Sequence, residues 1–295
     1  MRMPGSFSLW VLVCAWGVAP ATGAFKLSDQ DRVVLFGDTA VSEVRTLDWF
    51  DQFMRTRYPD RRPLVCNLGE PRCTVRGGLK RIEREVLPLA PTQVVLCFGL
   101  EGPERKRFDE ARLQTHIRDL RTMIDEFASR DIAVTLMTPP PPDEGRNRGL
   151  KRIGYRETVA RYAQAIRDLA QETELPLIDW HEAVLSRMRE FKGPGRPGWT
   201  QHGLKPSWFS HAILTDLLLS HWGAEPLDYL IRARWNSAEA AATIGKIKVT
   251  EHDAHNLHLD LHGVPVVVNM LARQKMNDEE FPLSKWFRYR LQIDD

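Results

Sequence analysis

The chain has 295 residues, of which 43% are hydrophobic and 27% are charged. This composition is that of ordinary globular material and excludes a disordered or fibrous protein. The 41 basic and 39 acidic residues are spread along the sequence and give a formal net charge of +2, so we expect no nucleic-acid partner.

The first 24 residues differ from the rest of the chain. Arg2 precedes an apolar run from Phe7 to Ala19, and small residues follow as far as Ala24. The run is short for a bilayer span, and the whole pattern is typical of a cleavable secretory signal. An uncleaved anchor is the alternative. We therefore expect a secreted or periplasmic protein that has no membrane contact once residues 1–24 are removed.

Three cysteines remain beyond the signal, namely Cys66, Cys73 and Cys97. An odd number leaves at least one thiol unpaired in an oxidising compartment. Cys66 could bridge to Cys73. Because Cys66 and Cys97 lie within apolar runs, the sequence favours small buried hydrophobic side chains over a disulfide.

From Arg32 onward, short apolar runs alternate with longer amphipathic stretches. The runs that predict strands are Val33–Phe36, Leu64–Leu68, Gln93–Phe98, Ala133–Met137 and Leu175–Ile178. The stretches that most clearly predict helices are Thr46–Tyr58, Glu110–Ser129, Glu157–Glu172 and Ser207–His221. This alternation predicts an α/β fold of three layers, flavodoxin-like, with a five-stranded parallel sheet between two layers of helices.

Beyond Trp222 the strand and helix alternation stops. Short β-like runs follow at Lys246–Val249, Asn256–Leu261, Val264–Asn269 and Arg288–Ile293. We expect residues 25–222 to form the main domain and residues 223–295 to form a small β-rich C-terminal extension.

A histidine-rich segment in this extension is a weak candidate for a metal site. On a strand, His258, Asp260 and His262 would share one face, and two histidines with a carboxylate suit zinc or another transition metal. A half-buried strand with a polar solvent face explains the same alternation. We therefore expect no metal, and the sequence carries no cofactor motif.

The residues that follow the predicted strands are the informative ones, because open parallel sheets bind ligands beyond the carboxyl ends of their strands. Four segments occupy such positions: Gly37–Thr39, Gly69–Thr74, Gly99–Gly102 and Thr138–Gly149. The last belongs to a loop, residues 138–150, that opens with four consecutive prolines. This loop is either a lid that contacts substrate or a polar surface loop without a special role.

The segment Val33–Thr39 resembles the first block of the SGNH (GDSL-type) hydrolase family. In that family a hydrophobic strand runs into Gly-Asp-Ser, and the serine is the nucleophile. Here Gly37 and Asp38 are retained, and Thr39 stands at the serine position.

The second and third blocks follow in the same order. Asn67–Thr74 resembles the second block, whose glycine N–H serves the oxyanion hole, and Arg72 aligns with that glycine. Val94–Glu101 resembles the third block, a strand followed by Gly-x-Asn. Gly99 is retained there, and Glu101 replaces the oxyanion-hole asparagine.

The fifth block of the family, Asp-x-x-His followed by Pro, corresponds to His202–Pro206. His202 stands at the aspartate position and Lys205 at the position of the general base. The resemblance spans roughly residues 30–222. It implies the SGNH-hydrolase fold and descent from ester hydrolases, of which exported relatives commonly act on carbohydrate esters.

The replacements bear on the chemistry that the resemblance implies. Ester hydrolysis needs an activated hydroxyl, a base, and donors aimed at the developing oxyanion. Lys205 is protonated at its ordinary pKa, and an ionised Glu101 places negative charge where negative charge must develop. We therefore expect a pseudoenzyme, with weak or lost hydrolysis.

Other interpretations of these residues stay open. Thr39, His202 and Glu101 could form a rearranged triad in an active esterase, with His202 as the base. Alternatively, Glu101 could be neutralised in a salt-bridged cluster by Arg72 or Lys205. A third interpretation is a non-catalytic module that binds a glycan or a protein.

Two tryptophans flank the fifth block. Trp199 and Trp208 could line the crevice, where flat aromatic faces suit sugar rings, although tryptophans also fill cores. The ligand class that we expect is a carbohydrate or an acylated small molecule.

Overall fold

The computed structural model describes residues 25–42, 47–58, 60–190 and 198–224, together with five strand segments beyond residue 227. The chain divides into two compact units, one that spans Ala24–Ala224 and one that contains the residues from Glu225 onward. The predicted signal segment, residues 1–24, lies outside the described residues.

The larger unit is built on a five-stranded parallel sheet. Its strands are β1 (Arg32–Gly37), β2 (Leu64–Asn67), β3 (Gln93–Cys97), β4 (Ala133–Met137) and β5 (Leu177–Ile178), in the order β2-β1-β3-β4-β5. All neighbouring pairs are parallel. The predicted sheet is confirmed, and the near-continuous apolar strand sequences reflect helices that cover both faces.

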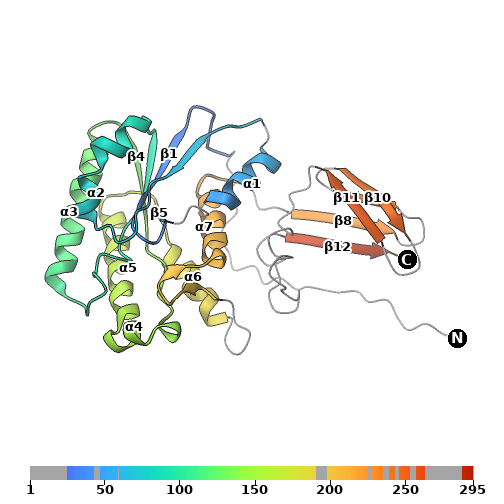
Figure 1. Cartoon of the computed structure of the whole chain (residues 1–295). Helices are drawn as coiled ribbons and strands as arrows, with labels where there is room; N and C mark the ends of the chain where they lie inside the picture. The colour runs from blue at the N-terminus through green and yellow to red at the C-terminus, as the bar shows by residue number, and fades with distance from the viewer. Residues whose placement is uncertain are drawn as a thin grey trace. The chain divides into compact units, whose positions relative to one another are not determined.

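Seven α-helices surround this sheet in the described part of the unit. They are α1 (Asp48–Arg57), α2 (Val75–Leu79), α3 (Glu110–Ala128), α4 (Arg148–Ile153), α5 (Tyr155–Glu172), α6 (Trp180–Glu190) and α7 (Trp208–His221). Figure 1 shows α2, α3 and α5 on one side of the sheet and α1, α6 and α7 on the other, which is the predicted three-layer arrangement. None of these helices is long and apolar enough to cross a membrane.

The main core lies between the sheet and the layer that contains α3 and α5. Alternate residues of β1 and β3, such as Phe36 and Leu96, pack there against Met123 and Phe127 of α3. Cys97 and Cys73 are buried, Cys66 is half-buried, and all three are free thiols. The structure thus contains no Cys66–Cys73 bridge.

The loop after β4 is a polar surface loop only in its second half. Pro139–Pro142 are all buried, and a Cβ added at Gly99 would lie only 3.0 Å from Pro139 Cγ. Proline rings are apolar and have no N–H to satisfy, so they enter the interior without an unpaired donor. Only the following residues, 144–149, reach the surface.

The C-terminal unit is β-rich, as predicted. Its segments are β8 (Asp228–Arg234), β9 (Glu239–Ala242), β10 (Lys246–His252), β11 (Leu257–His262) and β12 (Arg288–Asp294). β8 pairs in parallel with β12 and antiparallel with β9, while β10 and β11 form an antiparallel pair. The predicted strand Val264–Asn269 lies outside the described residues.

The residues of the proposed metal site alternate along β11. His258 is paired in register with Glu251, Asp260 with Lys248, and His262 with Lys246. Two of the three positions thus lie opposite lysines, whose positive charge disfavours the binding of a metal cation.

Gly37, at the end of β1, offers a test of how closely the strand ends are packed. A Cβ at this position would lie 2.2 Å from the Cys97 carbonyl oxygen and 2.7 Å from Val41 Cγ2. We expect Gly37→Ala to lower the free energy of unfolding by about 3 kcal/mol, measured by denaturant unfolding, because a backbone atom cannot move aside.

The matched control is Gly149→Ala in α4, where the nearest atom to the new Cβ is Asn147 Oδ1 at 3.2 Å, a side-chain atom that need give by only a few tenths of an ångström and can keep its hydrogen bond to the Leu150 N–H. We expect stability to stay unchanged or rise by up to about 1 kcal/mol, since alanine favours a helix. Equal losses in the two variants would contradict this account.

Candidate functional site

The site forms where β1 and β3 end side by side. Because neighbouring parallel strands place their carboxyl ends at one edge of the sheet, Thr39 and Glu101 come together although 62 residues separate them. Gly37 and Gly99 are both buried behind these two residues.

Asp38 fixes the geometry of this edge. Its carboxylate is completely buried and accepts three backbone hydrogen bonds of 2.9 Å, from Ala40 to Oδ1 and from Gly99 and Glu101 to Oδ2. Burial raises the pKa of Asp38 to about 6, while the three N–H donors favour the charged form. Asp38 therefore joins the turn after β1 to the loop after β3.

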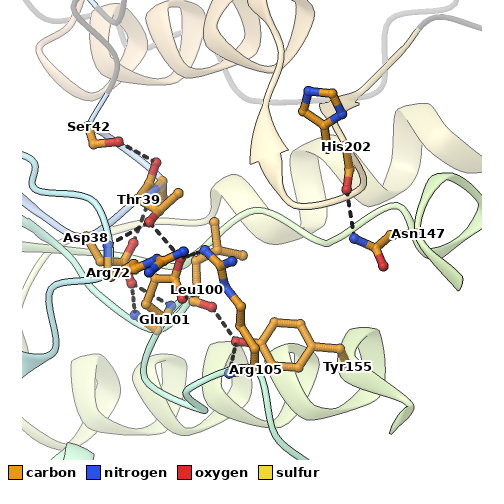
Figure 2. A network of polar contacts seen from close by, with 12 residues as sticks. Asp38, Thr39, Ser42, Arg72, Leu100, Glu101, Arg105, Asn147, Tyr155 and His202 are labelled. Atoms are coloured by element: carbon orange, nitrogen blue, oxygen red, sulfur yellow. Dashed lines mark hydrogen bonds and ion pairs between the residues drawn. The ribbon is translucent and has the colours of Figure 1, made fainter. Parts of the chain in front are cut away.

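Thr39 and Glu101 are in direct contact. The Thr39 hydroxyl donates to Glu101 Oε1 at 2.7 Å, and Thr39 Oγ1 accepts the Arg72 backbone N–H at 3.0 Å. Both side chains are buried, with 5% of Thr39 and 4% of Glu101 exposed. Figure 2 shows this group of contacts.

The partner of the Glu101 carboxylate is Arg105. Arg105 Nη2 lies 2.6 Å from Oε1, and Nε lies 3.1 Å from Oε2, so the ion pair has two contact points. Arg105 is a different residue from Arg72 and Lys205, the two partners that the sequence suggested. The run Arg105-Lys106-Arg107, four residues beyond Glu101, was the available signal.

Tyr155, at the start of α5, supports the loop that carries Arg105. Its hydroxyl donates to the Leu100 carbonyl at 2.7 Å and accepts the Arg105 backbone N–H at 3.1 Å (Figure 2). Burial raises the pKa of Tyr155 well above its ordinary value, so the phenol stays neutral. No sequence motif pointed to this residue.

Arg72 occupies a backbone conformation that suits glycine. Its φ is +64°, in the left-handed region that side chains other than glycine adopt at a cost. This conformation aims its N–H at Thr39, and it agrees with the alignment of Arg72 on the family's glycine. The side chain is exposed.

Arg81 anchors the loop that presents Arg72. Its guanidinium, 11% exposed, donates to the Leu68 carbonyl at 3.1 Å and pairs with Glu70 at 3.1 Å. It also lies 5.2 Å from the centre of the Phe36 ring. The start of the loop is thereby fixed to the core.

The segment of the fifth block forms a small hairpin, β6 (Thr200–Gln201) with β7 (Lys205–Pro206). His202 has a φ of +52°, and its carbonyl accepts a 3.0 Å hydrogen bond from Asn147 Nδ2. Figure 2 shows His202 well apart from Thr39. The structure therefore does not bring His202 to Thr39 as the rearranged triad would require.

The remaining candidates lie elsewhere. Lys205 is half-buried in β7, paired in register with Gln201. Trp199 is completely buried, with its ring centre 6.2 Å from that of Phe209, so it fills the core and does not line a crevice. The Trp208 side chain lies outside the described residues.

This geometry defines the protein as one with an SGNH-type ester-hydrolase fold: a Gly-Asp turn after the first strand, a donor from the second block, and a third-block loop, all at one sheet edge. Residues 36–212 match the model of the GDSL-like Lipase/Acylhydrolase family. The chain belongs to this family, and the resemblance stated from the sequence is confirmed.

Similar solved structures agree with this assignment. The lipase/acylhydrolase from Enterococcus faecalis is 27% identical, has a TM-score of 0.52, and is aligned over 66% of this chain and 96% of its own. An acetylxylan esterase from Geobacillus stearothermophilus is 21% identical, with a TM-score of 0.56 and coverage of 67% and 96%.

A third similar structure, of a gut microbial diltiazem-metabolizing enzyme, is 18% identical with a TM-score of 0.65. It covers 92% of this chain and 68% of its own. The esterase and this enzyme, both below 25% identity, show the fold alone. No curated protein sequence matches the chain.

The backbone of Arg72 can be tested by substitution. We expect Arg72→Gly to raise the free energy of unfolding by up to about 1 kcal/mol and Arg72→Val to lower it by about 1–2 kcal/mol, because a β-branched residue tolerates positive φ least. Thermal and denaturant unfolding measure both effects. Arg72→Ala, which loses the same guanidinium and keeps the strain, is the control and should fall between them; a Gly variant less stable than the Ala variant would refute the strain.

Proposed function

We propose that this chain is an exported SGNH-type protein of carbohydrate-esterase descent in which ester hydrolysis is weak or lost. The observation that carries the proposal is the 2.7 Å hydrogen bond from Thr39 to a carboxylate that Arg105 already neutralises. The hydroxyl at the nucleophile position thus donates to an ion-paired carboxylate and not to an imidazole.

Two physical arguments support weak hydrolysis. The Arg105 guanidinium contacts both oxygens of the Glu101 carboxylate, and Lys205 stands at the family's base position in place of a histidine. In addition, the Arg72 N–H that would serve an oxyanion is bound to Thr39 Oγ1, and Glu101 brings negative charge to the place of the family's asparagine. The loss of one oxyanion donor alone costs about 10²–10³ in rate.

The active-esterase alternative needs His202 beside Thr39, and the observed position of His202 does not favour it. The binding-module alternative fits the site better, since buried polar contacts hold its shape without a base. A carbohydrate or acylated ligand is the class that we propose, by analogy with the acetylxylan esterase of similar fold.

The hydrolysis test uses residues 25–295 with p-nitrophenyl acetate and acetylated xylo-oligosaccharides. We expect the unmodified protein and Thr39→Val, which keeps the shape of the side chain, to show the same background rate. An active esterase, run as a positive control, exceeds background by about 10⁶-fold or more. Turnover that approaches the rate of the positive control and disappears in Thr39→Val would show that the site is an efficient catalyst and that the proposal is wrong.

Export is proposed from the pattern of residues 2–24 and has its own test. We expect the full-length chain, expressed in a bacterial host, to be recovered outside the cytoplasm with a new N-terminus after Ala21, Gly23 or Ala24, as N-terminal sequencing would show. The control, Leu12→Arg, places a charge in the apolar run and should keep the protein inside. An intact N-terminus in both proteins would refute the proposal.

A further inference from the structure

A basic surface lies next to the candidate site, formed by the loop after β3 and by α4. We define it by the residues Arg105, Lys106, Arg107, Arg148, Lys151 and Arg152, all of which are exposed. The sequence spreads its charges evenly, but the fold brings these six cations together.

Two contacts join the two segments. Arg107 Nη2 donates to the Arg152 carbonyl at 3.3 Å, and the Arg105 N–H donates to Tyr155 at 3.1 Å, just beyond α4. Within α4, Arg148, Lys151 and Arg152 are three and four residues apart, so they share one helix face.

Two of the acidic groups around this surface pair with its own cations, whereas Glu144 and the neighbours of Arg107, Asp109 and Glu110, make no ion pair among the described residues. Glu104 pairs with Lys106 at 2.7 Å, Glu101 pairs with Arg105, and Glu144 accepts the Arg156 backbone N–H at 2.8 Å. Among the residues that the structure describes, Arg107, Arg148, Lys151 and Arg152 make no ion pair. Four exposed cations are therefore available to a negatively charged partner.

The surface continues directly into the site. Arg105 belongs to both, because its side chain is 41% exposed and yet contacts the Glu101 carboxylate that binds Thr39. A chain of anionic groups lying on α4 and Arg107 would thus extend to Arg105 at the margin of the site, while Thr39 itself is only 5% exposed. An extended ligand suits this layout better than a single small ion.

We propose that this basic surface binds an acidic polysaccharide, one that carries carboxylates on its sugars. The inference rests on the proposed carbohydrate-esterase descent and adds the charge of the ligand to it. We favour a polysaccharide over nucleic acid because the surface adjoins a site of proposed carbohydrate-esterase descent, and tighter binding of nucleic acid is an outcome of the test that would contradict this choice.

The experiment measures binding of residues 25–295 to fluorescently labelled oligogalacturonate by anisotropy, at low and high salt. We expect saturable binding that weakens with salt. Neutral xylo-oligosaccharides, duplex DNA of matched charge and anionic phospholipid vesicles are the comparison ligands. Binding of oligogalacturonate at least about tenfold tighter than each of them supports the proposal.

The test variant is Arg107→Glu with Arg152→Glu, which reverses two cations of the surface. Its control is Arg32→Glu with Arg130→Glu, which makes the same charge change at the opposite end of the sheet, where β1 begins and where α3 leads into β4. We expect the first variant to bind about tenfold or more weakly and the control to bind like the unmodified protein.

Three results would overturn the inference: no binding of oligogalacturonate, tighter binding of DNA or vesicles, or equal weakening in the two variants at unchanged thermal stability. None of them depends on turnover. The hydrolysis assay with Thr39→Val therefore decides the proposed function separately.

Discussion

The three hydrogen bonds to the buried Asp38 carboxylate are the constraint on which the site depends. They hold the turn after β1 and the loop after β3 in one arrangement, so that Thr39 and Glu101 face each other. A buried carboxylate is costly unless its oxygens are satisfied, and here backbone N–H groups satisfy them. The backbone conformation of the site therefore depends on Asp38 and not on the side chains of Thr39 and Glu101.

The carboxylate at position 101 belongs to a set of residues that depend on one another. A carboxylate at position 101 needs a cation when it is buried, and Arg105 supplies it. Arg105 in turn depends on Tyr155, which fixes the backbone of its loop. The result is a connected polar network in which each member has a partner. An active esterase would instead leave hydrogen-bond donors unpaired for its substrate.

Much of the fold could be predicted from the sequence, because apolar runs and the Gly-Asp turn are local signals. The alignment of Arg72 with the family's glycine also followed from the order of the blocks, and the positive φ of Arg72 agrees with it. The ion-pair partner of Glu101 could not be predicted from the sequence. The conformation of the loop decides that Arg105 makes the contact, although its neighbours are equally basic. Likewise, Asn147 sets the position of His202 through a contact between segments 55 residues apart, which no local pattern reveals.

The two edge strands of the parallel sheet are short. β2 has four residues and follows Pro63, which lacks an N–H, while β5 has two residues. Long, flat edge strands pair readily with strands of other molecules, whereas short edge strands near proline pair with them less readily. The architecture therefore guards the chain against edge-to-edge aggregation, a protection of particular value to a protein that lacks disulfides among its described residues.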